Sequence, residues 1–223
     1  MTKVLIFLTN QATMGDLDEA NGTYIPELTH ALDKLLEAGF DYDLVSIKGG
    51  AAPLYGADDS DDITQRFLAD ETFSHKVANT LTLDKLQADD YAAVYYPGGF
   101  GLLWDLAQNE QVAAITAGLY DKGAVVGAVC HGPGALLPIT LSNGESILAG
   151  KAVTAFTREE EIDFGTIEKI PFLVEESLTR KAGSFTKLAP WSNHVITDGR
   201  LITGQNPASA GAVGAAMVAL IQA

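Results

Sequence analysis

Apolar residues along this chain occur in two patterns, short unbroken runs and longer stretches in which they recur every three or four positions. The unbroken runs are rich in valine, isoleucine and tyrosine. Such runs are typical of parallel strands that are buried on both faces, so the pattern predicts a mostly parallel sheet. The predicted strands are residues 3–9, 42–47, 91–96, 124–129 and 152–156.

The recurring pattern predicts helices between these strands. Residues 25–40 place four leucines on one helical face ahead of Gly39, a residue type that commonly ends a helix. Residues 109–123 repeat the pattern and end at Gly123. Because strands and helices alternate, the sequence predicts an α/β fold with helices around the sheet. The four leucines are Leu28, Leu32, Leu35 and Leu36.

Three further segments complete the predicted organisation. Asp198-Gly199 joins two apolar runs and predicts a hairpin over residues 194–205, and a helix of small residues is expected over 207–221. Residues 50–90 are long for a connection between a strand and a helix, so we expect a helical insertion there. Its acidic residues, over 56–73, are typical of a solvated surface. We expect one domain over residues 1–223.

Composition limits the partners and the compartment. The 223 residues carry a formal charge of −15, which would repel nucleic acid and an anionic membrane surface. No apolar run approaches the ~18 residues of a membrane span, and the first run is too short for a signal peptide. A single cysteine cannot form an internal disulfide, so we expect a cytoplasmic protein.

That cysteine, Cys130, stands where a predicted strand turns into a helix. Small residues two positions before and after it, Ala128 and Gly132, match the spacing of a nucleophile elbow. The N–H groups at the start of a helix are expected to favour a thiolate there. The sequence therefore predicts that Cys130 is a catalytic nucleophile.

Two other strand ends could complete such a site. Gly98 and Gly99 follow the strand that ends at residue 96, and the amides of Gly99 and His131 are candidates for an oxyanion hole. Glu27 follows the loop after the first strand, where its carboxyl could move a proton. We also expect Phe100, His30 and Trp104 to line the pocket. The histidines show no metal-ligand spacing, so we expect no metal site.

The segments "AVCHGPGAL", "YYPGGFG", "TAFTREEE" and "WSNHVITDGRLITGQNPASA", together with the early glutamate, resemble the DJ-1/PfpI superfamily and its Hsp31-like branch. The resemblance implies a flavodoxin-like three-layer α/β/α sandwich. It also implies catalytic roles for Cys130, His131 and Glu27, with Glu159 or Glu160 as a third acid. Related glutamine amidotransferases carry a late His-x-Glu pair, which is absent here because Val195 and Ile196 follow His194.

The activity implied by the resemblance is that of a glutathione-independent glyoxalase, a lyase of the glyoxalase III type that needs no cofactor. It would convert methylglyoxal and related 2-oxoaldehydes to 2-hydroxy acids through a cysteine hemithioacetal. Two alternatives are a Cys-dependent peptidase or amidase, and a holdase chaperone or oxidative-stress sensor. A small closed pocket favours the glyoxalase and an open cleft the peptidase. Expected partners are a small carbonyl substrate, a second copy in a homodimer and, for the chaperone, unfolded proteins.

Overall fold

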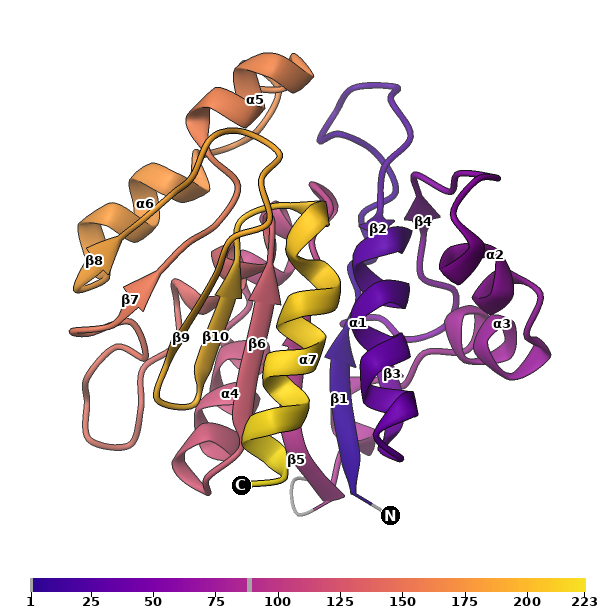
Figure 1. The fold of residues 1–223 in the computed structure, drawn as a ribbon, viewed down its shortest axis with the longest axis horizontal. Helices are drawn as coiled ribbons and strands as arrows, with labels where there is room; N and C mark the ends of the chain where they lie inside the picture. The colour runs from indigo at the N-terminus through magenta and orange to yellow at the C-terminus, as the bar shows by residue number, and fades with distance from the viewer. Residues whose placement is uncertain (1, 88–89) are drawn as a thin grey trace.

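Six strands form the central sheet of the computed structural model, which describes residues 2–87 and 90–223. The strand order is β3-β1-β5-β6-β10-β9 (Figure 1). Neighbouring strands run parallel except β9, which pairs antiparallel with β10 at the edge. The strands are β1 (Lys3–Phe7), β3 (Asp41–Val45), β5 (Tyr91–Tyr96), β6 (Val125–Val129), β9 (Val195–Asp198) and β10 (Leu201–Gly204).

This order confirms the predicted flavodoxin-like fold. The first five strands in the order are the second, first, third, fourth and fifth parallel strands along the chain, which is the flavodoxin arrangement. Ligands of such sheets bind beyond the carboxyl ends of the strands. The residues predicted to be functional follow β5 and β6 at that edge.

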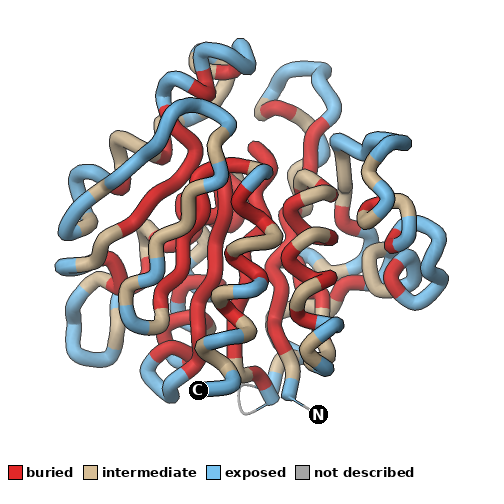
Figure 2. The backbone as a smooth tube through the Cα atoms, in the orientation of Figure 1, coloured by how far each residue is buried: buried red, intermediate tan, exposed pale blue. Residues whose placement is uncertain are grey.

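Helices cover both faces of the sheet, and its inner strands are almost wholly buried, whereas the edge strand β9 is partly exposed (Figures 1 and 2). Helices α1 (Ile25–Glu37) and α7 (Ala210–Ile221) lie on one face and α4 (Glu110–Asp121) on the other. Three of the four leucines predicted for the inner face of α1 are buried, whereas Leu36 is 40% exposed. The small residues of α7 serve packing within the chain, because a Cβ at Gly214 would lie 2.6 Å from the Ala31 carbonyl oxygen of α1.

The segment between β3 and β5 holds the helices α2 (Asp62–Leu68) and α3 (Glu71–Ala78). Each begins at an aspartate, Asp61 or Asp70, whose side chain accepts hydrogen bonds from the first turn. The expected insertion over 50–90 includes residues 88 and 89, which lie outside the described residues. Ahead of these helices, β4 (Leu54–Tyr55) pairs with β2 (Thr23–Tyr24), just before α1.

The strand predicted at 152–156 is wrong in its placement. Only β7 (Ala152–Val153) is extended, and it pairs with β8 (Ser184–Phe185) outside the central sheet. The position beside β6 is taken by β10, so no place remains for it there. Beyond β7 lie α5 (Arg158–Phe164) and α6 (Val174–Lys181). Short 3₁₀ turns cover Leu83–Lys85, Gly101–Leu103, Leu106–Gln108, Gly132–Leu136 and Pro207–Ser209.

Among the helices of the described residues, none combines the length and the apolar character that crossing a membrane requires.

Candidate active site

Cys130 lies at a strained turn directly after β6. Its φ is 60°, and Trp191 is the other described non-glycine residue with positive φ. The turn is held at both sides, since the Cys130 amide donates to Gly204 and the Cys130 carbonyl accepts from Phe156, each at 2.9 Å. Backbone strain of this kind persists only where the surroundings impose it. The geometry is that of the nucleophile elbow expected from the sequence.

His131 connects the thiol to an acid. Its Nδ1 lies 3.2 Å from Cys130 Sγ, and its Nε2 lies 2.7 Å from Oε1 of Glu161. Because a carboxylate only accepts, Nε2 carries the proton and Nδ1 is left to accept from the thiol. The other oxygen of Glu161 accepts from the Thr166 hydroxyl. Cys130, His131, Glu161 and Thr166 thus form one buried hydrogen-bonded chain.

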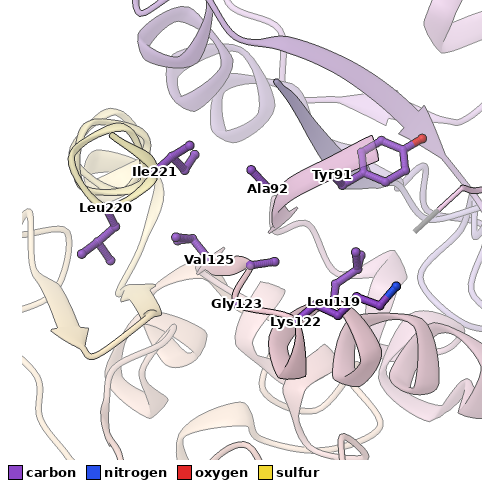
Figure 3. Close-up of a pocket in the computed structure, with 9 residues that line it drawn as sticks. Tyr91, Ala92, Leu119, Lys122, Gly123, Val125, Leu220 and Ile221 are labelled. Carbon is purple, nitrogen blue, oxygen red and sulfur yellow. The ribbon is translucent and has the colours of Figure 1, made fainter. Parts of the chain in front are cut away.

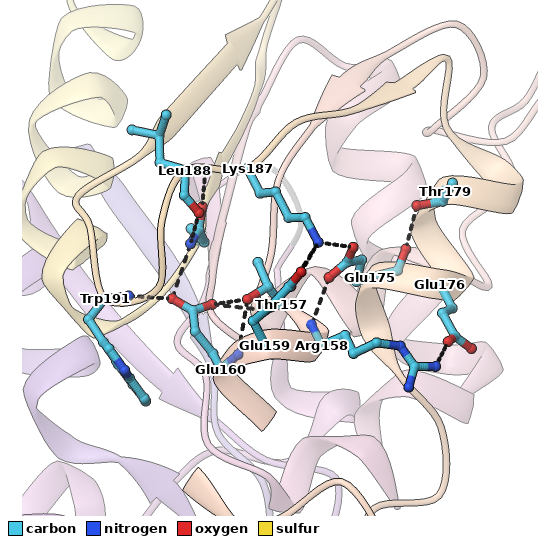
Figure 4. A network of polar contacts seen from close by, with 11 residues as sticks. Thr157, Arg158, Glu159, Glu160, Glu175, Glu176, Thr179, Lys187, Leu188 and Trp191 are labelled. Atoms are coloured by element: carbon cyan, nitrogen blue, oxygen red, sulfur yellow. Dashed lines mark hydrogen bonds and ion pairs between the residues drawn. The ribbon is translucent and has the colours of Figure 1, made fainter. Parts of the chain in front are cut away.

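The acid beside His131 therefore differs from the two expected, Glu159 and Glu160. Successive residues of a helix point about 100° apart, and only Glu161 of α5 faces the histidine. Glu159 is exposed and pairs with Lys187 at 2.8 Å. Glu160 is fully buried and turns toward the loop before β9 (Figure 4). Spacing along the sequence cannot separate three adjacent glutamates, but the phase of the helix does.

Glu160 is a structural anchor. Its Oε1 accepts from the amide of Trp191 at 2.8 Å and from the side chains of Gln205 and Asn206. Its Oε2 accepts from the amide and hydroxyl of Thr157, closing a capping box at the start of α5. One carboxylate thus joins α5 to the loop that carries Trp191 and to the turn after β10.

Replacing Glu160 with alanine is expected to lower the free energy of unfolding by about 3 kcal/mol or more, because it leaves several buried donors without an acceptor. Glu159→Ala, at the neighbouring exposed position, should cost less than about 1 kcal/mol. Urea unfolding followed by circular dichroism measures both. Equal losses for the two variants would contradict the anchoring role.

Glu27 lies beside the thiol in the first turn of α1. Its side chain is wholly buried, and neither oxygen has a hydrogen-bond partner of standard geometry among the described residues. Burial raises the pKa of Glu27 from its usual 4.5 to about 8, while the Cys130 thiol and the Gly98 amide act in the opposite direction. At neutral pH most of this carboxyl therefore keeps its proton.

The thiol does not gain the acidity expected from a helix start. A 3₁₀ turn of five residues, Gly132–Leu136, follows Cys130 instead of an α-helix. Burial, followed by the charge of Glu27, raises the pKa of the Cys130 thiol well above its usual 9.0. A thiolate therefore forms when a neighbouring base takes the proton, and Nδ1 of His131 lies in position to do so.

Gly98 and Gly99 let the backbone pass close to these groups. A Cβ at Gly98 would lie 2.4 Å from Oε2 of Glu27 and 2.7 Å from the Cβ of Cys130. Gly99 has φ 105°, and a Cβ there would lie 2.3 Å from the Gly22 carbonyl oxygen. Within the described residues, no backbone hydrogen bond uses the N–H of Gly99 or His131. The oxyanion role of these two amides stays a prediction.

Gly98→Ala is expected to reduce turnover at least about tenfold by pushing Glu27 away from Cys130, since small misplacements of catalytic groups are costly. Gly118→Ala in α4, where a Cβ would meet nothing within 4 Å, is the matched control and should keep full activity. Initial rates at saturating substrate measure both. Unchanged rates in Gly98→Ala would contradict the tight packing inferred here.

A cavity of about 60 Å³ opens onto Cys130. At about 30 Å³ for each water in the liquid, this volume corresponds to about two water molecules, so the cavity suits only a small compound. Its walls are mainly aromatic, and the ring of His131 lies between Phe100 and Phe156 at 4.4 and 4.6 Å between centroids. The lining residues are Tyr24, Glu27, Tyr55, Phe100, Cys130, His131, Phe156, Phe164, Trp191 and Pro207.

Phe100 lines this cavity as expected, but His30 and Trp104 do not. His30 binds Asp61 at 2.8 Å, across the contact between α1 and α2. Trp104 packs over Gly15, where a Cβ would lie 3.0 Å from its ring. Sequence reasoning missed Tyr55, which the insertion supplies, and Phe164, which the last turn of α5 supplies. Neither belongs to a motif that marks it.

A larger hollow, of about 460 Å³, lies at the other end of the sheet, where β5 and β6 begin and α7 ends (Figure 3). Its lining, in the part of the chain that the structure describes, includes no cysteine, histidine or carboxylate. The candidate catalytic side chains therefore lie at the smaller cavity, beside Cys130. Among the described residues, no group of three or more histidine, cysteine or acidic side chains is arranged to hold a metal ion.

The site thus combines a buried Cys-His-Glu chain, at an elbow of a flavodoxin-like sheet, with a second glutamate beside the thiol. The chain belongs to the DJ-1/PfpI family, whose model matches residues 19–220. Within the family it belongs to the Hsp31-like branch, as its relatives indicate.

Two curated relatives cover nearly the whole chain. It is 32% identical to the glutathione-independent glyoxalase HSP31 of Saccharomyces cerevisiae, covering 93% of each protein. It is 30% identical to glyoxalase 3 of Candida albicans, covering 94% of each.

Solved structures agree with this placement. The Rapid Encystment Protein 24 KDa of Francisella tularensis has a TM-score of 0.94 at 31% identity, with 99% of each chain covered. The glyoxalase III of Candida albicans has a TM-score of 0.84 at 28% identity, covering 98% of this chain and 97% of that one.

Proposed function

We propose that this protein is an enzyme, a glutathione-independent glyoxalase that converts methylglyoxal and related 2-oxoaldehydes to 2-hydroxy acids. The observation that carries the proposal is the small cavity at which the Cys130 thiol lies beside both His131 and the buried carboxyl of Glu27. The relatives named as glyoxalases support it, because they match this chain over nearly its whole length.

The first step joins the substrate to the protein. The thiol passes its proton to Nδ1 of His131, and the sulfur attacks the aldehyde carbon to give a hemithioacetal. Glu161 accepts a hydrogen bond from Nε2 and thereby stabilises the charged imidazole. The amides of Gly99 and His131 donate to the oxygen that becomes negative. The proton on His131 then neutralises that oxygen.

The second step moves a proton between carbons. The carboxylate of Glu27 takes the proton from the former aldehyde carbon and returns it to the neighbouring carbon, giving a thioester of the 2-hydroxy acid. A base whose pKa is about 8 suits this work near neutral pH. Water then hydrolyses the thioester, releasing the acid and restoring the thiol. The sum adds one water to the substrate and needs no oxidant, which makes the protein a cofactor-independent lyase.

A peptidase or amidase would use the same Cys-His-Glu chain. The cavity of about 60 Å³ favours a three-carbon substrate over a peptide, which needs an open cleft. Glu27 also argues for the lyase, because acyl transfer by a Cys-His pair requires no second carboxyl at the sulfur. We therefore rank hydrolysis second.

The test is methylglyoxal consumption by the purified protein in the presence of a chelator and without glutathione. The expected result is catalytic loss of methylglyoxal with one lactate formed for each molecule consumed. A fluorogenic peptide and a simple amide serve as competing substrates. Stoichiometric adduct formation without lactate, or cleavage of the peptide instead, would overturn the proposal.

A holdase role is the second candidate, because large apolar side chains are exposed close to the cavity. Phe164 and Trp191, whose rings lie 6.2 Å apart, are 56% and 42% exposed. Exposed apolar patches can bind unfolded chains. Suppression of aggregation of a heat-denatured client, lost in Phe164→Ser, would support this role, whereas unchanged suppression would argue against this surface.

A further inference from the structure

Two tyrosines stand side by side over the thiol, and one of them comes from the insertion. The short parallel pair of β2 and β4 aligns Tyr24 with Tyr55. Their rings are 5.3 Å apart in an edge-on arrangement, and both line the cavity with Glu27 and Cys130. Figure 1 shows β4 beside the first turn of α1, which carries Glu27. The insertion therefore supplies part of the wall that a bound substrate contacts.

The oxygen of the Tyr55 hydroxyl already accepts from the backbone. The backbone N–H of Phe100 approaches its oxygen, and burial raises the pKa of Tyr55 well above its usual 10.0, with Cys130 and Glu27 adding to the rise. The phenol therefore keeps its proton. The tyrosines of β5 engage partners inside the protein, as Tyr95 does with the Glu27 carbonyl at 2.7 Å. No described residue accepts the proton of Tyr55, so it is available to a ligand in the cavity.

A 2-oxoaldehyde carries two carbonyl oxygens, and each needs a donor. The Gly99 and His131 amides serve the oxygen on the carbon that the sulfur attacks. We propose that Tyr55 donates a hydrogen bond to the second carbonyl oxygen, on the neighbouring carbon, and so selects substrates with adjacent carbonyl groups. This inference rests on the proposed function.

The contact would strengthen during the proton transfer. When Glu27 removes the proton from the first carbon, that electron pair forms a carbon–carbon double bond, and the second carbonyl bond opens to leave negative charge on its oxygen. Glu27 then returns its proton to the second carbon. The hydroxyl on the first carbon loses its proton as that carbon becomes the thioester carbonyl, and the second oxygen takes up one proton to become the hydroxyl of the product. A donor at the second oxygen stabilises the charged intermediate more than the substrate, which raises kcat.

The test compares Tyr55→Phe with Tyr42→Phe, a buried tyrosine of β3 outside the cavity. Tyr55→Phe is expected to lower kcat for methylglyoxal by about tenfold to a hundredfold with a smaller change in KM. Tyr42→Phe should match the parent. Propanal has the same carbon chain without the second carbonyl, so its protection of Cys130 against iodoacetamide should be equal in Tyr55→Phe and the parent.

Each outcome decides the role of Tyr55. A kcat within about twofold of the parent, or equal weakening of propanal and methylglyoxal binding, overturns it. If the parent makes no lactate, the proposed function fails and the alkylation experiment still judges Tyr55. In that case, weaker protection by methylglyoxal alone in Tyr55→Phe supports a contact with the second carbonyl, and unchanged protection overturns that contact.

Discussion

Cys130→Ser is expected to lower methylglyoxal turnover by about 10⁴-fold or more, because a serine hydroxyl in this position is a far weaker nucleophile than a thiolate. The buried turn holds the side chain, which is 4% exposed, in one place beside His131. The substitution keeps the size and position of the reacting atom and changes mainly its acidity and nucleophilicity. Lactate formation at saturating methylglyoxal measures the loss.

The chain offers a clean control for this result. Cys130 is the only cysteine, so labelling by a thiol reagent reports on the site alone. The parent should lose activity in proportion to the label it takes up, and the melting temperature of Cys130→Ser should stay close to that of the parent. Residual activity above about one hundredth of the parent rate would show that the sulfur is not the nucleophile.

Glu27→Gln is expected to lower turnover by about 10²- to 10⁴-fold, because it removes the base that moves the proton between the two carbons. The hemithioacetal should still form, so the variant should accumulate an adduct of one methylglyoxal at Cys130, visible by mass spectrometry. The matched control is Glu37→Gln at the exposed end of α1, which should keep parental activity. Rapid lactate formation by Glu27→Gln would contradict the assignment.

The same residue fixes the expected pH dependence. The base is the carboxylate, and its pKa is about 8, so kcat/KM of the parent should rise with pH up to about 8 and then level off. In Glu27→Gln that inflection should vanish from the residual rate. A parental profile that is flat between pH 6 and 9, within about twofold, would show that a different group takes the proton.

The free energy of unfolding should fall as pH rises, whereas kcat/KM should rise. The folded pKa of Glu27 is raised from 4.5 to about 8, so between these values the folded protein binds more protons here than the unfolded chain does. The stability of the parent relative to Glu27→Gln should therefore fall as pH rises through this window, by up to about 1.4 kcal/mol per pH unit. Thermal melting of both proteins across the window measures this difference.

The sequence predicts the sheet and the elbow because both rest on local patterns. Unbroken apolar runs occur where strands are covered on both faces, and a thiol between small residues at a strand end marks a sharp turn. The run at 152–156 has the same composition, but it lies outside the central sheet because β10, from much later in the chain, pairs with β6 instead. Competition between distant segments cannot be read from one run.

The site was predictable as far as its residues belong to motifs. Cys130, His131 and Glu27 meet at one cavity as expected, whereas the acid that contacts His131 is set by the phase of α5. His30 has the spacing to face the cavity, yet Asp61, the residue that caps α2, lies close enough to bind it. Tyr55 belongs to a short strand that pairs with β2 outside the central sheet. Such placements depend on tertiary packing and carry no local pattern.

The backbone hydrogen bonds that hold the turn at Cys130 come from segments that are synthesised later than the cysteine. The amide of Cys130 is bonded to Gly204, at the end of β10. A growing chain therefore contains the cysteine long before the strand that holds its turn. The turn that places the thiol beside His131 is therefore completed only when β10 pairs with β6, so the catalytic centre is among the last parts of the protein to assemble.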